Sequence, residues 1–310
     1  MKAIVFEQYG GPDVLELREV PRPFLRANDV LIEVHAASVN PVDWKIRAGH
    51  LREMIHYDLP VIPGWDAAGV VVDAGPEVER FKKGDAVFSR TDIARNGTYA
   101  EYVAVDEKYV ALKPSVLSYE EAASIPLVGL TAWQALVDYA GIKKGDRVLI
   151  HAGAGGVGAF GIQLAKDFCC YVTTTCSTPN VEFVRSLGAD HVIDYTKSDF
   201  STELQDFDVV FDTEGGEIYK KSFKVLKRQQ GVIVSILEQP DHDLADRARV
   251  RAGYLFMHPD GMELANIGEL IERGLIKPTV ENVFPLAEAR KAHELSESGH
   301  ARGKIVIKVR

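Results

Sequence analysis

The sequence predicts an α/β protein that combines a doubly wound parallel sheet with a separate β-rich domain. Its 310 residues exceed the length of one average domain, which favours two. From Val148 onward, strand-like apolar runs alternate with helical patterns, as in a parallel sheet with helical crossovers. Before about residue 113 the chain shows short strands separated by turns, which is typical of a β domain.

The β-rich part is defined by apolar runs and by the turns between them. Gly, Pro, Asp and Lys residues at 10–13 and 82–85 form two of these turns. The runs are short and irregularly spaced, which suits a compact, barrel-like domain. The expected strands are Ala3–Phe6, Val30–Ala36, Ala67–Ala74, Ala86–Phe88 and Tyr99–Val105.

A junction follows at residues 113–115, and a helix is expected directly after it. Ser118 and Glu121 fit a capping box, and helical patterns continue to Leu130–Val137. The strands and helices that follow predict right-handed crossovers and a parallel sheet. The expected strands are Val148–Ala152, Tyr171–Thr175, His191–Asp194, Val209–Asp212 and Val232–Ile236.

The end of the chain is expected to return to the β-rich domain. Helices are predicted over Leu264–Glu272 and Leu286–Ser296, and Lys304–Val309 reads as an alternating strand. If this strand rejoins the first sheet, the β-rich domain is discontinuous. We place it at residues 1–115 and 257–310, and the α/β domain at residues 116–256.

One short motif occurs twice. Lys-Lys-Gly-Asp-x-Val stands at residues 82–87 and again at 143–148. Each copy precedes an expected strand, so we predict the same turn at both places and no larger internal repeat.

The strand at 148–152 leads into a glycine-rich turn and then into a helix. Gly153, Gly155 and Gly158 have the G-x-G-x-x-G spacing. In dinucleotide-binding Rossmann units these glycines permit a tight turn, close approach of a pyrophosphate, and packing of helix on strand. The N–H groups and positive dipole end of the helix face the phosphates. The sequence therefore predicts NAD(P) binding, although the spacing alone also fits a plain turn.

The end of the second α/β strand bears on the choice of dinucleotide. NAD-specific units carry an acidic side chain there, which binds the ribose hydroxyls. Residues 175–180, Thr-Cys-Ser-Thr-Pro-Asn, contain no carboxylate, and their hydroxyls can donate to a 2′-phosphate. NADPH is therefore favoured over NADH, although this turn contains no Arg or Lys. Ser177 and Thr178 also fit a simple helix cap before Pro179.

Charge and composition limit the partners and the compartment. The formal charge of −9 argues against nucleic acid or an anionic membrane as the main partner. The three cysteines, Cys169, Cys170 and Cys176, fit free thiols better than a disulfide framework. No apolar run approaches membrane length, and the first residues read as a strand. We expect a cytoplasmic protein.

Several segments, together with the glycine-rich turn and Gly303-Lys304, resemble the medium-chain dehydrogenase/reductase superfamily. The resemblance is to its zinc-free, quinone oxidoreductase-like (zeta-crystallin-like) branch and extends over nearly the whole chain. It implies a GroES-like β-rich catalytic domain, a Rossmann domain, and a homodimer paired through the edge of the Rossmann sheet. The matching segments are Ser38–Trp44, Ile62–Gly69, Gly97–Tyr102, Gly129–Trp133 and Leu187–Tyr195.

Zinc-dependent members of this superfamily differ at the positions that hold the metal. They have a cysteine in the segment matching Ser38–Asp43 and a His-Glu pair after the glycine matching Gly64. This chain has Asn40 and Asp43 in the first segment and Trp65-Asp66 in the second, and no cysteine in Phe88–Gly97 where the structural zinc lobe would lie. We therefore expect no zinc. Without a Lewis acid, an easily reduced acceptor such as a quinone or an alkene conjugated to a carbonyl is the expected substrate.

The resemblance also implies roles for individual residues of the β-rich domain. Asn40 would donate to the acceptor oxygen beside the nicotinamide, unless it is only a turn amide. Asp43 would position Asn40 or relay a proton, or serve as a structural turn carboxylate. Trp44 would line the cleft or pack in the core. Tyr57 resembles the placement of the tyrosine acid of enoyl-thioester reductases and is a candidate proton donor.

For the cofactor, the resemblance places the glycine-rich turn at the pyrophosphate. Thr131 would lie near the phosphates or nicotinamide, or simply pack within its helix. The expected cofactor-binding residues are Thr131, Gly153, Gly155, Gly156, Val157, Gly158, Thr175, Ser177, Tyr195, Ile236 and Leu237. The nine histidines show no ligand spacing, and structural or surface roles are expected for them.

Two alternatives to a quinone or enone reductase remain open at this stage. One is a 2-enoyl thioester reductase, which needs a definite proton donor and a basic patch for its substrate's phosphates. The other is an NADPH-binding sensor or structural protein with vestigial activity, because fold alone does not fix function.

Overall fold

A computed structural model describes the whole chain, residues 1–310. The chain forms two compact units. The first unit comprises Met1–Leu127, Pro259–Gly274 and Pro278–Arg310, and the second comprises Val128–His258 and Leu275–Lys277. The sequence places the boundaries after residues 115 and 256, whereas the structure divides inside the helix that contains Leu127 and Val128.

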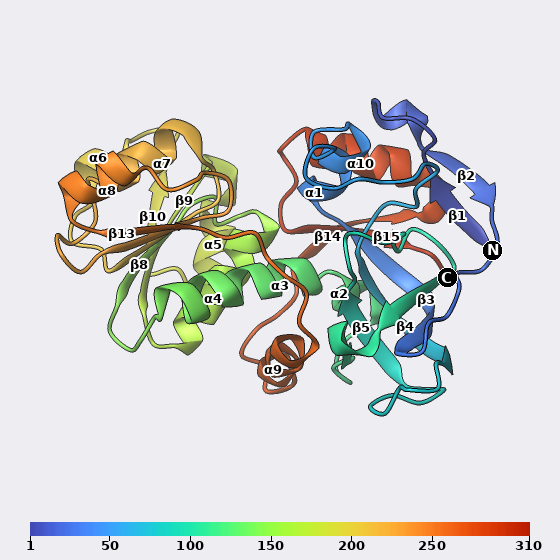
Figure 1. The fold of residues 1–310 in the computed structure, drawn as a ribbon. Helices are drawn as coiled ribbons and strands as arrows, with labels where there is room; N and C mark the ends of the chain where they lie inside the picture. The colour runs from blue at the N-terminus through green and yellow to red at the C-terminus, as the bar shows by residue number, and fades with distance from the viewer. The chain divides into compact units, whose positions relative to one another are not determined.

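The first unit contains a seven-stranded sheet and a separate two-stranded sheet (Figure 1). The larger sheet has the order β14-β15-β3-β4-β5-β7, with β6 paired to β3, and only the β14–β15 pair is parallel. The last strand pairs with β3 and so returns to the first sheet, as predicted. No pair joins β7 to β14 to close a barrel. The strands are β1 (Lys2–Val5), β2 (Glu16–Glu19), β3 (Asp29–Val39), β4 (Asp66–Ala74), β5 (Ala86–Arg90), β6 (Tyr102–Asp106), β7 (Val110–Leu112), β14 (Val280–Pro285) and β15 (Lys304–Lys308).

Side-chain caps mark where the helices of the first unit begin. The capping box predicted at Ser118 is confirmed, since its hydroxyl accepts from the Glu121 N–H and the Glu121 carboxylate accepts from the Ser118 N–H. Asp260 likewise accepts from the first N–H groups of α9. The helices are α1 (Pro41–Arg47), α2 (Tyr119–Ala123), α9 (Gly261–Glu272) and α10 (Ala289–Glu297), with 3-10 turns at Pro12–Val14, Glu107–Tyr109 and Leu286–Glu288.

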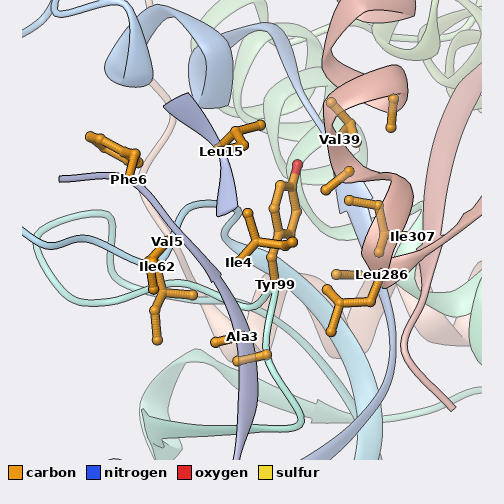
Figure 2. Close-up of a cluster of buried hydrophobic side chains, with 14 of the residues drawn as sticks. Ala3, Ile4, Val5, Phe6, Leu15, Val39, Ile62, Tyr99, Leu286 and Ile307 are labelled. Atoms are coloured by element: carbon orange, nitrogen blue, oxygen red, sulfur yellow. The ribbon is translucent and has the colours of Figure 1, made fainter. Parts of the chain in front are cut away.

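The main core of the first unit surrounds a buried tyrosine. Figure 2 shows the ring of Tyr99 among aliphatic side chains, including Ile4 of β1, Val39 of β3 and Ile307 of β15. Tyr99 is fully buried, so its hydroxyl must find its partners inside the protein. The strand predicted over Tyr99–Val105 begins only at Tyr102, because the Tyr99 N–H donates to the Pro63 carbonyl outside any ladder.

The second unit is a six-stranded parallel sheet with the order β10-β9-β8-β11-β12-β13. This is the doubly wound order, and its direction reverses between β8 and β11. The glycine-rich turn follows β8 and therefore lies at that switch point. The strands are β8 (Arg147–Ile150), β9 (Tyr171–Cys176), β10 (His191–Asp194), β11 (Val209–Asp212), β12 (Val232–Ser235) and β13 (Arg251–Tyr254).

Helices cover both faces of this sheet. In Figure 1, α4 lies on one face and α6, α7 and α8 lie on the other. A seven-residue π-helix, Gln134–Ala140, continues directly from α3. The helices are α3 (Pro126–Trp133), α4 (Gly156–Asp167), α5 (Val181–Ser186), α6 (Phe200–Glu203), α7 (Gly216–Ser222) and α8 (His242–Ala248), with a 3-10 turn at Thr178–Asn180.

Two buried glutamines fix the ends of the segments that connect the units. The Gln134 amide donates to the carbonyl of His258 at 2.9 Å and accepts from its N–H at 3.2 Å. Gln163 makes the same pair of bonds with Lys277, at 3.0 and 2.9 Å. Each side chain therefore satisfies backbone groups as a neighbouring strand would.

The repeated motif forms the same turn twice, as predicted. The N–H of Lys82 donates to the Asp85 carboxylate at 2.9 Å, and that of Lys143 donates to the Asp146 carboxylate at 3.0 Å. The glycine between them has a φ of +98° in the first copy and +89° in the second. Both turns lead into strands, β5 and β8.

Four strands, β2, β7, β13 and β14, were not among the sequence predictions. β13 contains Gly253, which normally weakens a strand, but the Tyr139 ring occupies the space beside it. A Cβ at Gly253 would lie 2.1 Å from the Tyr139 ring and hydroxyl. This tertiary contact explains a strand that local sequence does not indicate.

Candidate active site and dinucleotide site

The glycine-rich turn joins β8 to α4 in the second unit. A Cβ on Gly153 would lie 2.1 Å from Thr174 Oγ1, and one on Gly158 would lie 2.3 Å from the Ala152 carbonyl oxygen. Packing therefore requires both glycines. A Cβ on Gly155 would meet only that carbonyl, at 3.4 Å. Packing does not exclude a side chain at Gly155, whereas a ligand against the backbone there would.

The first turn of α4 suits an anion. Gly155 is its N-cap and has no side chain to bind the helix N–H groups, and Gly156 and Val157 follow. The helix is 12 residues long and directs its positive dipole end at this turn. The turn thus fits the pyrophosphate of a dinucleotide.

The hydroxyl of Thr175 is bound inside the protein. It accepts from the Ala152 N–H at 3.1 Å and lies 3.2 Å from His151 Nδ1. His151 Nε2 lies 2.9 Å from the hydroxyl of Ser222, which donates to the carbonyl of Ile218. His151 therefore donates from Nε2 and accepts from Thr175 at Nδ1, and burial lowers the pKa of His151 to about 3. This network stabilises the start of the glycine-rich turn.

Asp212 organises the neighbouring edge of the sheet. Its carboxylate accepts from two backbone N–H groups of the following turn, at 3.0 and 3.1 Å, and from the Ser235 hydroxyl at 2.6 Å. Ser235 in turn accepts from the N–H of Leu237 at 3.1 Å. These bonds join the turns after β11 and β12 at the carboxyl ends of the strands, where open parallel sheets bind ligands. Ile236 is half-buried there and Leu237 is exposed.

The ends of β9 and β10 place hydroxyls and a lysine around one carboxylate. Asp194 accepts from the hydroxyls of Thr178 and Thr196, both at 2.6 Å, and from Lys197 at 2.9 Å. These hydrogen bonds hold the pKa of the Asp194 carboxyl well below its usual range. The turn after β9 has no carboxylate or cation of its own. Asp194 at the end of β10 supplies the carboxylate, and Lys197 after it supplies the cation.

The other predicted cofactor residues differ in exposure. Tyr195 is 60% exposed, beside Asp194. The Ser177 hydroxyl accepts from the Asn180 amide at 3.2 Å and makes no helix-capping bond. Thr131 is buried within α3. All three belong to the second unit, as does the glycine-rich turn.

In the first unit, Asn40 joins β3 to α1, and its amide is held at both ends. Lys304 donates to Oδ1, and Nδ2 donates to the Asp66 carboxylate at 2.8 Å. An ammonium has only donors and a carboxylate only acceptors, so the two ends of the amide are distinguished by chemistry. Nδ2 carries a second N–H, to which the structure gives no acceptor. That N–H can donate to a ligand oxygen.

Asp66 is the anionic centre of this cluster and is fully buried. Besides Asn40, it accepts from the Ser38 hydroxyl at 3.0 Å and from the Leu127 N–H at 3.1 Å. The guanidinium of Arg90, also buried, lies 3.8 Å from Oδ1 of Asp66, the oxygen that accepts from Leu127. Such a buried carboxylate is tolerated only with this many donors and cations around it.

A chain of hydrogen bonds ends at the carboxylate of Asp43. Its Oδ2 accepts from the Asn40 N–H at 2.9 Å and from the Tyr99 hydroxyl at 3.0 Å. Tyr99 lies 3.3 Å from His293 Nε2, and His293 Nδ1 lies 3.2 Å from an Arg47 nitrogen. Because Arg47 can only donate, Nδ1 accepts and Nε2 carries the hydrogen toward Tyr99.

This chain of hydrogen bonds orients Asp43. It does not conduct protons, because the Arg47 guanidinium at its far end does not release a proton. Burial lowers the pKa of His293 to about 3, so the imidazole stays neutral. Burial raises the pKa of Asp43 to about 7, with the charge of Arg90 opposing the rise. The second oxygen of Asp43 is buried without a partner.

The hydroxyl of Tyr57, the predicted proton donor, is already hydrogen-bonded within the protein. It donates to the carbonyl of Ile93 at 2.5 Å, and burial raises the pKa of Tyr57 above its usual range. Trp44 is half-buried on α1, and its indole N–H has no acceptor. Of the three predicted catalytic residues, Asn40 and Asp43 are hydrogen-bonded to each other and Tyr57 is bound elsewhere.

The residues at the zinc-matching positions do not fit a zinc ion. The amide of Asn40 is taken up by Lys304 and Asp66, and the Trp65 indole donates to the Arg95 carbonyl. A tetrahedral site needs several N, S or O ligands converging on one point, and a buried ammonium at that point would repel the metal.

Sequence reasoning did not assign the partners of these residues. Arg90, Tyr99 and His293 lie far from Asn40 in the chain, and no local motif joins them to it. In the sequence, Lys304 stands only in the matching pair Gly303-Lys304. A charged residue at the start of an apolar strand was the one available signal of its burial.

Comparisons with known proteins match two families to the chain. Residues 26–115 match the family described as alcohol dehydrogenase GroES-like domain, and residues 187–307 match the family described as zinc-binding dehydrogenase. The second description names a metal that the residues around Asn40 do not fit.

Individual relatives cover the whole chain. It is 35% identical to the mitochondrial NAD(P)H oxidoreductase RTN4IP1 of Danio rerio, over 100% of this chain and 91% of that protein. It is 39% identical to the chloroplastic NADPH-dependent alkenal/one oxidoreductase of Arabidopsis thaliana, over 99% of this chain and 79% of that protein. The structure of the quinone oxidoreductase from Coxiella burnetii matches with a TM-score of 0.92 and 40% identity, over 100% and 99% of the two chains.

None of the helices in the structure has both the length and the apolar character needed to span a bilayer.

Proposed function

The chain belongs to the medium-chain dehydrogenase/reductase superfamily, in its quinone oxidoreductase-like branch, and we propose that it reduces quinones or carbonyl-conjugated alkenes with NADPH and without zinc. Bound NADPH supplies a hydride, and the protein supplies orientation and hydrogen bonds. One observation carries the proposal: an amide held between a lysine and an aspartate lies in the segment that, by resemblance, matches the zinc-binding segment of zinc-dependent relatives. Without a Lewis acid, the substrate must accept hydride easily.

Within this reaction, the second N–H of Asn40 donates to the acceptor oxygen as that oxygen gains negative charge. Asp43 positions Asn40 through its backbone N–H, which supports the positioning role among those predicted for Asp43. The bond between Tyr57 and the Ile93 carbonyl makes Tyr57 the weaker candidate for proton donor. A proton from solvent completes the reduction.

The second unit binds the dinucleotide, with the pyrophosphate at Gly155, Gly156 and Val157. We assign the 2′-phosphate of NADPH to the neighbourhood of Ser177, Tyr195 and Lys197. Lys197 is 67% exposed and offsets the charge of Asp194. Thr131, Ile236 and Leu237 are assigned to the nicotinamide end, as the resemblance implies.

The assembly and location proposed from the sequence stay part of this proposal. β13 is an edge strand, paired only with β12, and a second copy of the chain could extend the sheet there. We propose a homodimer through this edge, in the cytoplasm.

An acceptor panel tests the proposed function. Oxidation of NADPH and NADH is followed anaerobically with a benzoquinone, a naphthoquinone, an enone and a 2-enoyl thioester, before and after chelator treatment. We expect turnover of quinones or the enone, a preference for NADPH, and no effect of the chelator. Turnover of the thioester alone would favour the enoyl reductase alternative. NADPH binding without turnover of any acceptor would favour a sensor.

A further inference from the structure

Lys304 is a buried lysine at the start of β15, and its ammonium makes two specific contacts. It donates to the carbonyl of Val39 at 2.8 Å and to Oδ1 of Asn40. The three residues that follow it in β15 are buried and apolar. Burial of an ammonium is costly, and an apolar side chain would fill this position with less penalty.

The charged groups around Lys304 come from three other elements. Asp66 of β4 and Asp43 of α1 attract its charge, and Arg90 of β5 repels it. Two carboxyls and two cations therefore share one buried region. The lysine contacts neither carboxylate directly, and its two bonds go to a backbone carbonyl and to the Asn40 amide. Its geometry thus serves the amide rather than an ion pair.

We propose that Lys304 is a positioning residue of the reductase, which fixes the Asn40 amide so that its second N–H faces the acceptor oxygen. This inference rests on the proposed function. Asp66 bonds only the nitrogen end of the Asn40 amide, and Lys304 supplies the hydrogen-bond donor for its oxygen end. An ammonium at Oδ1 also withdraws electron density from the amide, which makes its N–H groups stronger donors. The effect is largest when the acceptor oxygen carries charge, that is, in the transition state.

A double-mutant cycle tests whether Lys304 acts through Asn40. The variants are Asn40→Ala, Lys304→Met and the double variant. Lys308→Met is the matched control, because Lys308 lies on the same strand, is exposed and pairs with Glu120. The readouts are kcat with an enone, the Kd for NADPH, and the unfolding midpoint. We expect Asn40→Ala to lower kcat by roughly 100-fold, as loss of one such donor does, and Lys304→Met by about 10-fold.

The diagnostic result is non-additivity. If Lys304 works through the amide, the double variant is no slower than Asn40→Ala alone, and the NADPH Kd changes less than about twofold throughout. Independent, additive losses would overturn the inference, as would Lys304→Met with wild-type kcat. If the wild type reduces no quinone or enone, the proposed function itself fails. If Asn40→Ala lowers kcat and Lys304→Met does not, only the role of Lys304 fails.

The pH profile gives a second test that needs no variant of Lys304. Burial lowers the pKa of Lys304 to about 8, against the opposing effect of Asp66 and Asp43. Deprotonation removes the positive charge that Lys304 holds against the amide oxygen of Asn40, so the kcat of the wild type should fall on the alkaline side near pH 8. Asn40→Ala should lack this fall, whereas Asp43→Asn should retain it at a lower pH, because loss of the Asp43 charge lowers the pKa of Lys304 further. A fall that persists in Asn40→Ala, or is lost in Asp43→Asn, would contradict the inference.

Discussion

The two candidate sites of this molecule are built in opposite ways. The dinucleotide site of the second unit is a stretch of backbone, in which Gly155 has no side chain and the first turn of α4 has no cap. The site of the first unit consists of buried side chains, with Asp66, Arg90 and Lys304 around the amide of Asn40. The first leaves backbone N–H groups open, whereas the second is held together by hydrogen bonds between buried side chains.

Because the two sites are built differently, substitutions in them should affect different properties of the protein. An open backbone site can be disturbed locally without loss of the fold, whereas a buried charge cluster supports its own unit of the protein. We therefore expect a side chain at Gly155 to alter mainly affinity for the dinucleotide, and changes in the cluster to alter turnover and stability together.

The largest effect on stability is expected from Asp66→Asn. The asparagine places a new donor among groups that already donate, and it removes the carboxylate that pairs with the buried guanidinium of Arg90. Breaking such a buried pair costs about 3–5 kcal/mol of unfolding free energy. Glu182→Gln is the control, since Glu182 is 84% exposed in its pair with Arg185. Urea unfolding measures the free energy of unfolding of both variants. Equal losses in the two would contradict this prediction.

Asp43→Asn should change how stability depends on pH. The pKa of Asp43 in the folded protein, about 7, lies above the ordinary value of 3.8. The folded state therefore keeps a proton that the unfolded state has lost, and this contribution to stability declines as pH rises from about 4 to 7, by at most about 1.4 kcal/mol per pH unit. Relative to the variant, the wild type should lose stability across that window. Parallel curves for the two proteins, from denaturant titrations at several pH values, would be evidence against a raised pKa.

Two glycine variants distinguish a packing role from a binding role within the dinucleotide site. Gly158→Ala should cost about 1–3 kcal/mol, because the new Cβ would lie 2.3 Å from the Ala152 carbonyl oxygen. Gly155→Ala should leave unfolding within about 0.5 kcal/mol of the wild type and weaken NADPH binding about tenfold or more. Thermal unfolding and fluorescence titration with NADPH separate the two effects. Unchanged affinity in Gly155→Ala would mean that the turn does not hold the pyrophosphate.

The contrast between the sites also explains what could be predicted from sequence. The glycine-rich turn is contiguous, so its spacing and flanking elements identify it, and the predicted parallel sheet follows from the alternation of strands and helices around it. The first-unit cluster draws on β3, α1, β4, β5 and β15, and only Ser38, Asn40 and Asp43 lie close together in the chain. That Lys304 reaches Asn40 depends on the β15–β3 pairing, which no local pattern specifies.

The smallest predicted effect concerns the choice of dinucleotide. Lys197→Met should reduce the preference for NADPH over NADH by a factor of about five to ten, since an exposed cation near a phosphate contributes about 1 kcal/mol. Lys224→Met, a lysine exposed elsewhere on the second unit, is the control. Ratios of kcat/KM for the two dinucleotides give the answer. An unchanged ratio would remove Lys197 from the 2′-phosphate site.

The central claim is that hydride passes from NADPH to a conjugated acceptor without a metal. The direct measurement uses chelator-treated protein, an enone, and NADPH carrying deuterium at C4 in either of its two positions. We predict one deuterium on the β-carbon of the product from only one of the two labelled forms, at a rate unaffected by the chelator. A product without deuterium, or activity that disappears with the chelator and returns with zinc, would contradict the claim.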